Sequence, residues 1–81
     1  MSEVVDRLKR EILEIARREA ETRDIPLCRA LENIQDRLYR VAGEAMRRRR
    51  FAEAERSMQI VDLVREVERQ QGCISHAWRG L

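Results

Sequence analysis

The stretch Arg47-Arg48-Arg49-Arg50-Phe51-Ala52-Glu53-Ala54-Glu55 decides the fold of this chain. It lies inside a segment, from Pro26 to about Gln70, whose residues permit helix throughout. One possibility is a single helix of 45 residues, because four consecutive arginines do not stop a helix. The other is a turn near Arg49, after which a second helix returns antiparallel to the first. The aromatic and small residues that follow the arginines favour the turn, so we expect a helical hairpin.

Residues 49–56 resemble the middle of a tetratricopeptide repeat, where an aromatic residue opens the second helix and a small residue three positions later lets the helices pack closely. Phe51 and Ala54 occupy those positions in this chain. The resemblance covers about 25 residues, has no second copy, and departs from the repeat at Arg49, where a turn-forming residue such as glycine is usual. It supports a hairpin and not membership of the repeat family. The core positions that it implies are Leu38, Val41, Ala42, Ala54 and Met58.

Two further patterns place a helix on either side of the break at Asp24-Ile25-Pro26, where proline ends one helix and suits the first turn of the next. A stripe at helical spacing predicts a first helix over about residues 3–22, and a seam in steps of four and three predicts a second from about Pro26. The stripe consists of Val5, Leu8, Ile12, Ile15 and Ala16. The seam consists of Leu27, Leu31, Ile34, Leu38, Val41 and Ala45, with Cys28, Gln35, Tyr39 and Met46 widening the buried face.

The predicted fold is all-α: a small up-down-up bundle of three helices, built from the hairpin and an N-terminal helix. Gly72 is a natural left-handed stop for the last helix. We therefore expect one helical domain over residues 1–72 and a short C-terminal tail over residues 73–81. A domain of 81 residues has only a few kcal/mol of net stability, which a homodimer would increase.

The third helix has apolar residues on more than one side. Phe51, Ala54, Met58 and Val61 share one side, while Ile60, Leu63, Val64 and Val67 spread around the flank. A helix that is apolar nearly all round requires a second covering surface. Either the tail provides it, through Ile74 and Trp78, or the surface is a homodimer seam or a groove for a partner. The partner-binding residues predicted on the second reading are Ile60, Leu63, Val64, Val67 and Trp78.

The cluster Arg47–Arg50 has two interpretations. Arginines at the C-terminus of a helix complement its dipole and keep a turn solvated. Alternatively, Arg47, Arg48, Arg49 and Arg50 contact an anion, either nucleic-acid phosphate or an acidic protein surface. No aromatic residue interleaves these arginines, which weighs against nucleic acid.

The two cysteines test the hairpin. If the chain turns near Arg49, Cys28 and Cys73 lie at the same end of two antiparallel helices and come within bridging distance. A cytosolic location favours two reduced thiols, and a disulfide is the alternative. With His76 they provide three zinc ligands where a structural site requires four, so we expect no metal.

Catalytic motifs are absent from the sequence: it has no glycine-rich phosphate loop, no metal-type helix motif and no base well placed for a cysteine nucleophile. It also has no apolar run of about 18 residues and no signal-peptide pattern, so we expect a soluble cytoplasmic protein without membrane contact. The predicted function is a non-enzymatic protein-interaction module without cofactor: a small regulator, inhibitor or adaptor, such as a phage- or plasmid-type inhibitor of host machinery. The alternative is a nucleic-acid-binding transcriptional regulator that uses Arg47–Arg50.

Overall fold

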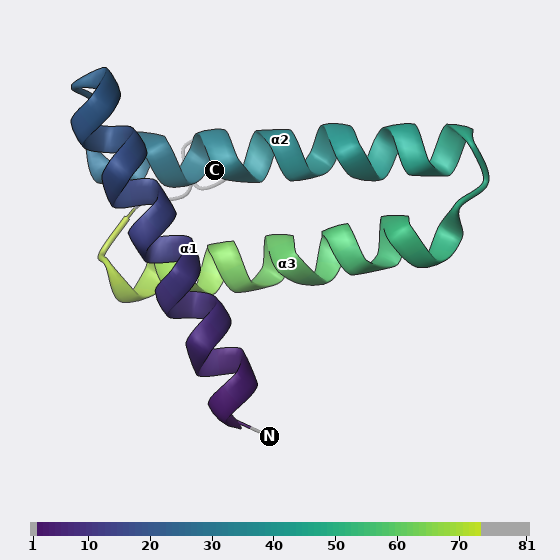
Figure 1. Cartoon of the computed structure of the whole chain (residues 1–81), viewed down its shortest axis with the longest axis horizontal. Helices are drawn as coiled ribbons and strands as arrows, with labels where there is room; N and C mark the ends of the chain where they lie inside the picture. The colour runs from purple at the N-terminus through teal and green to yellow at the C-terminus, as the bar shows by residue number, and fades with distance from the viewer. Residues whose placement is uncertain (1, 74–81) are drawn as a thin grey trace, which may run out of the picture.

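Three helices make up residues 2–73, the part of the chain that this computed structural model describes, with the side chain of Ser2 left out. They are α1 (Ser2–Arg23), α2 (Leu27–Arg47) and α3 (Phe51–Gln70). Figure 1 shows α2 and α3 side by side and antiparallel, with α1 crossing them obliquely at one end. The predicted all-α fold of three helices is confirmed, and the alternative of one long helix is wrong. We call the end of the hairpin where α2 begins the base, and the end at Arg48–Arg50 the tip.

Each helix ends on a residue with left-handed backbone. Asp24, Arg49 and Gly72 have φ of 54°, 58° and 75°. In each case the N–H of the following residue donates to the carbonyl oxygen five positions back, which is the Schellman motif that satisfies the last turn of a helix. These bonds join Ile25 to Ala20, Arg50 to Ala45 and Cys73 to Glu68, at 3.0, 2.8 and 2.8 Å. The predicted stop at Gly72 is therefore confirmed, and the hairpin turns at Arg49 although no glycine is present there.

The main core lies at the base, where all three helices meet. Its buried residues come in pairs from the three helices: Ile12 and Ala16, Ala30 and Leu31, and Val64 and Val67. Leu13, Ala20, Ile34 and Leu63 are among the partly buried residues packed against them. The core is aliphatic, and its small residues on α1 and α2 allow the crossing helices to approach closely.

Only the middle of α1 is covered by the hairpin, because α1 crosses the hairpin instead of running along it (Figure 1). Ile12 and Ala16 of the predicted stripe are buried, whereas Val5, Leu8 and Ile15 are exposed. Near the crossing, Arg37 of α2 forms an ion pair with Glu19 of α1. The stripe predicts one buried side, but the structure buries only Ile12 and Ala16 of it and leaves Ile15, which lies between them, exposed.

The tip half of the hairpin is a layer of two helices. Small side chains are buried between them, namely Ala42, Ala45, Ala54 and Ser57. Larger apolar residues around these positions have no third helix to cover them. Tyr39 and Met46, predicted to widen the buried face of the second helix, are exposed, and so is Val41 of the predicted seam.

A disulfide joins the base of the hairpin. The sulfur atoms of Cys28 and Cys73 are bonded, and the two Cα atoms lie 5.7 Å apart. The predicted approach of the two cysteines is confirmed, but the expectation of two reduced thiols is wrong. Neither sulfur is a free thiolate that binds zinc, and His76 lies outside the described residues.

We expect loss of this disulfide to destabilise the fold, because the bond closes a loop of 45 residues and restricts the unfolded chain. Reduction with a dithiol, or the double variant Cys28→Ser/Cys73→Ser, should lower the free energy of unfolding by about 2–4 kcal/mol. Chemical denaturation followed by circular dichroism measures this change. The double variant also serves as the control for the dithiol, which should not change its free energy of unfolding. Equal stability of the oxidised and reduced wild-type protein would contradict the bond.

We expect Arg49→Gly to stabilise the protein. A side chain at positive φ costs about 1–2 kcal/mol, of which the greater backbone freedom of unfolded glycine cancels about half. The net gain of about 0.5–1 kcal/mol should raise the melting temperature by several degrees. The matched control is Arg48→Gly, at φ −90°, which should give no gain. Equal effects of the two substitutions would argue against a left-handed Arg49.

Candidate partner-binding groove

The predicted partner-binding residues do not form one surface. Val64 and Val67 are 0% and 2% exposed and belong to the core that includes Ile12 and Ala16 of α1. Leu63 is half-buried against the same core, and Ile60 is exposed. Trp78 lies outside the described residues. The prediction is wrong for Val64 and Val67, because α1 covers these two residues instead of the tail or a partner.

The residues that do form a continuous apolar surface lie in the tip half of the hairpin. Tyr39 and Met46 of α2 and Phe51 and Met58 of α3 are 37%, 53%, 58% and 40% exposed. They surround the small residues Ala42, Gly43 and Ala54, and together with Glu55 they line a shallow groove of about 450 Å³. We call this the tip groove: large apolar walls around a floor of small residues.

The tip groove occupies one of two faces of the tip half. Tyr39, Gly43 and Met46 follow one another at steps of four and three, so they lie on one side of α2. Val41 is two residues from Tyr39 and therefore points to nearly the opposite side. Val41 and Ile60 are the exposed apolar residues outside the groove in this half of the hairpin.

Tyr39 is held in place from the opposite helix. The guanidinium of Arg65 on α3 donates a hydrogen bond to the Tyr39 hydroxyl oxygen over 2.7 Å. A hydrogen bond to a charged group is stronger than one between neutral groups. The bond satisfies the polar end of the ring and leaves its apolar edge available as one wall of the tip groove.

Gly43 is a glycine in the middle of a helix. Its φ is not positive, and a Cβ placed on it would meet nothing within 4 Å. Mid-helix glycine costs about 0.5–1 kcal/mol relative to alanine. Neither backbone conformation nor close packing within the described residues accounts for that cost. What Gly43 does provide is open space in the floor of the tip groove.

Most of the predicted anion-contact residues are already paired with carboxylates. Arg47 and Arg48 both donate to the Glu44 carboxylate, and the hydrogen bond and charge of Arg47 lower the pKa of Glu44. Arg50 lies 3.8 Å from a Glu53 carboxylate oxygen. Arg49, the left-handed residue of the turn, makes no ion pair within residues 2–73. All four arginines are exposed, as expected for a solvated turn.

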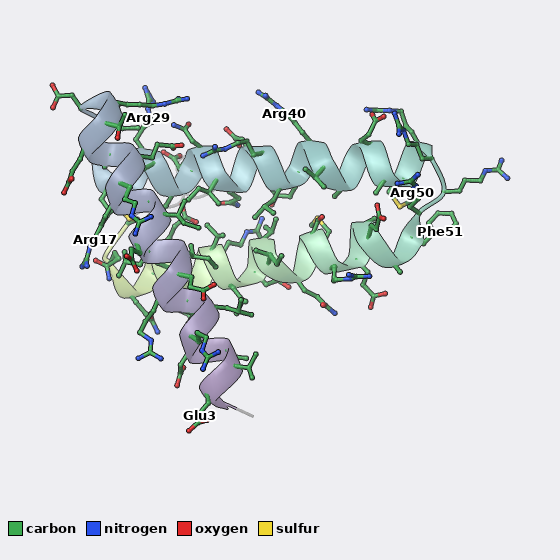
Figure 2. The ribbon with its side chains drawn as sticks, viewed as in Figure 1. Glu3, Arg17, Arg29, Arg40, Arg50 and Phe51 are labelled. Carbon is green, nitrogen blue, oxygen red and sulfur yellow. A yellow bond between two sulfur atoms is a disulfide. The ribbon has the colours of Figure 1, made fainter. Side chains whose placement is uncertain are left out.

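The tip nevertheless keeps an excess of positive charge. Residues 40–53 hold five arginines against two glutamates, a net charge of +3. Arg40, Gly43 and Arg47 follow one another at steps of three and four, so arginines flank the glycine along one edge of the tip groove. The three residues also line a second, more polar hollow of about 710 Å³, which meets the groove at Tyr39 and Gly43. Figure 2 shows Arg40 extending from α2 away from α3, and Arg50 and Phe51 at the tip.

Apolar surface and charge are the two features that the tip groove and its edge offer a ligand. Within residues 2–73 no three His, Cys, Asp or Glu side chains gather to hold a metal ion. The same part of the chain contains no helix that is both long and apolar enough to span a membrane. An apolar groove with a charged edge binds a partner by burying apolar surface and selects it by charge.

Sequence reasoning found the residues of the tip groove but not their role. Tyr39, Met46 and Met58 are predicted to face the core, since helical periodicity identifies apolar sides without saying where a third helix stops, and Phe51 is predicted only to open the second helix of the hairpin. Mid-helix Gly43 was the available signal, because nothing in the predicted bundle required it.

Comparisons of this chain with models of known protein families, with curated protein sequences and with solved structures find no match.

We expect Gly43→Ala to raise the free energy of unfolding by about 0.5–1 kcal/mol, because alanine is the better helix former and the added methyl group meets no atom within 4 Å beyond its chain neighbours and its own helix backbone. Urea denaturation followed by circular dichroism measures the difference. The matched comparison is Ala42→Gly, at the neighbouring buried position, which should cost at least as much as Gly43→Ala gains. A loss of stability in Gly43→Ala would show that the floor of the tip groove is closed.

Proposed function

We propose that this protein is a non-enzymatic protein-interaction module, a small regulator, inhibitor or adaptor, that binds a partner protein through the tip groove. The observation that carries the proposal is the exposure of Tyr39, Met46, Phe51 and Met58 around a floor of small residues. Exposed apolar residues gathered into one patch mark binding sites more often than single ones do.

The composition of the groove supports a protein as the ligand. Aromatic residues and methionine are enriched in the centres of protein interfaces, where they bury large areas. Methionine is also flexible enough to adapt to the shape of a partner. Met46 and Met58 come from opposite helices, so a partner seated between them contacts both arms of the hairpin.

The alternative, a nucleic-acid-binding regulator, is supported by the net charge of +3 over residues 40–53. It is weakened by the ion pairs that Arg47, Arg48 and Arg50 make with Glu44 and Glu53. Phosphate binding must compete with those carboxylates. Nucleic-acid binding through the arginines would also leave the apolar walls of the tip groove without a role.

Self-association and cellular location remain predictions. A homodimer built on Val64 and Val67 would require α1 to leave the base, so any dimer of the folded chain uses other surfaces. A cytoplasmic location is harder to reconcile with the Cys28–Cys73 bond, because structural disulfides persist mainly in oxidising compartments.

We expect the double variant Met46→Glu/Met58→Glu to abolish partner binding while the protein stays folded. Both side chains are substantially exposed, so the charges remain solvated in the free protein but would be buried in a complex. The matched control is Val41→Glu, which places a charge on the other face of the tip half. The measurement is affinity capture from cells that express the tagged protein, with quantitative mass spectrometry.

Circular dichroism should show equal helicity for wild-type protein and both variants. A protein retained by the wild type and by Val41→Glu, and lost from Met46→Glu/Met58→Glu, supports the tip groove. Captured proteins that are the same for all three, or that are lost only from Val41→Glu, would contradict it.

A further inference from the structure

We propose that the tip groove receives an amphipathic α-helix of a partner protein, with its apolar side in the groove and an acidic edge against Arg40 and Arg47. This inference rests on the proposed function and specifies the partner of that site. It follows from three observations: the dimensions of the groove, the open position at Gly43, and the distribution of charge along the edge.

The dimensions fit a short helical segment. From Tyr39 to Met46 the α2 wall covers eight residues, whose seven steps of about 1.5 Å give a length of about 10 Å. Phe51 and Met58 form the other wall over a similar length of α3. Two to three turns of a helix, with apolar side chains at positions i, i+3, i+4 and i+7, match a groove of this length.

Gly43 gives that helix a place to approach. The absent side chain opens the floor between Tyr39 and Met46, and apart from the adjacent residues and the backbone of its own helix no atom of the described residues lies within 4 Å of the Cβ position. Helices pack by fitting the side-chain ridges of one into the grooves of the other. A large side chain of the partner over Gly43 would fill the space that the glycine keeps open. The glycine itself lowers the stability of the helix, and this use of the space would account for it.

Charge complementarity predicts which side chains line one edge of the partner helix. Arg40 and Arg47 flank Gly43 on α2, and the net charge over residues 40–53 is +3. Because Arg47 also pairs with Glu44, an acidic edge on the partner would compete for it and would gain from this charge mainly in rate of association and in orientation. Glu55, which lines the α3 side of the groove, disfavours acidic residues on the other edge of the partner.

A second copy of this chain fits less well. In a twofold symmetric interface the same surface meets itself. Two tip grooves in contact would place one region of net charge +3 against another, which opposes association. A partner of different sequence and opposite charge avoids this repulsion.

The experiment uses a displayed library of helical 14-residue peptides. Selection is performed on the full-length, disulfide-bonded protein, with counter-selection on Gly43→Leu, a variant that fills the floor of the groove. Because the Cβ position is open, leucine should leave the fold intact, which circular dichroism and melting temperature check. Selected peptides should carry apolar residues at i, i+3 or i+4, and i+7, with Asp or Glu along one edge.

Fluorescence anisotropy then measures the affinity of one selected peptide for matched variants. Gly43→Leu should weaken binding by more than about 30-fold, because leucine fills the pocket that the partner needs. Gly43→Ala should change it by less than about threefold, because alanine adds only one methyl group. Arg40→Gln/Arg47→Gln should weaken binding about 3- to 10-fold, as expected for two exposed ion pairs, and should reduce its dependence on salt.

The outcomes separate this inference from the proposed function. Peptides that Gly43→Leu excludes but that lack helical spacing or an acidic edge would overturn the acidic helix while retaining the groove. Peptides that bind Gly43→Leu as well as wild type, or a library that yields no binder, would count against the groove and thus against both proposals. Two further results would show that the groove binds a different kind of partner. One is a concentration-dependent dimer, seen by light scattering, that Gly43→Leu dissociates; the other is salt-dependent binding of a 20-base-pair duplex that only Arg40→Gln/Arg47→Gln removes.

Discussion

The left-handed backbone of Arg49 is the constraint on which the rest of the structure depends. It allows the Arg50 N–H to reach the Ala45 carbonyl and sends the chain back along α2. Because α3 returns, Cys73 meets Cys28, and the beginning of α2 lies beside the end of α3. That pair of helix ends is the platform on which α1 packs (Figure 1). In a continuous helix of 45 residues the two cysteines would lie about 67 Å apart, and the core at the base would not exist.

The position of α1 divides the hairpin into two parts with different properties. At the base a third layer buries Leu31, Val64 and Val67, and the disulfide closes the same end. At the tip two helices alone bury only what fits between them, namely alanines and Ser57. Apart from the buried Val61, the larger apolar side chains there remain exposed, namely Tyr39, Val41, Met46, Phe51, Met58 and Ile60. The tip groove is therefore a consequence of the short reach of α1, and the stability of the base is what allows the tip to expose apolar surface.

The helices themselves were predictable from the sequence, since they follow from periodicity, the Pro26 break and the Gly72 stop. What covers each apolar side was not. Val64 and Val67 seemed to require a partner because a helical wheel gives the direction of a side chain and not the angle at which another helix crosses. Tyr39 and Met46 were assigned to the core for the same reason. The geometry of the hairpin places both cysteines at one end and allows the disulfide, whereas the expected cytosolic compartment favours reduced thiols.

The arginine cluster is explained largely by the turn. Arginines at the end of α2 complement its dipole, and those at positions 47, 48 and 50 pair with Glu44 and Glu53 beside them. Glu44 responds with a lowered pKa, as a carboxylate does when its charged form is hydrogen-bonded. The charge that remains is diffuse and exposed, and exposed charge orients a ligand more than it binds one. Affinity must then come from apolar burial, and within the tip half the surface arranged to provide it is the groove between Tyr39, Met46, Phe51 and Met58. In the proposed complex the arginines act on that groove from its edge, by selecting which apolar helix enters.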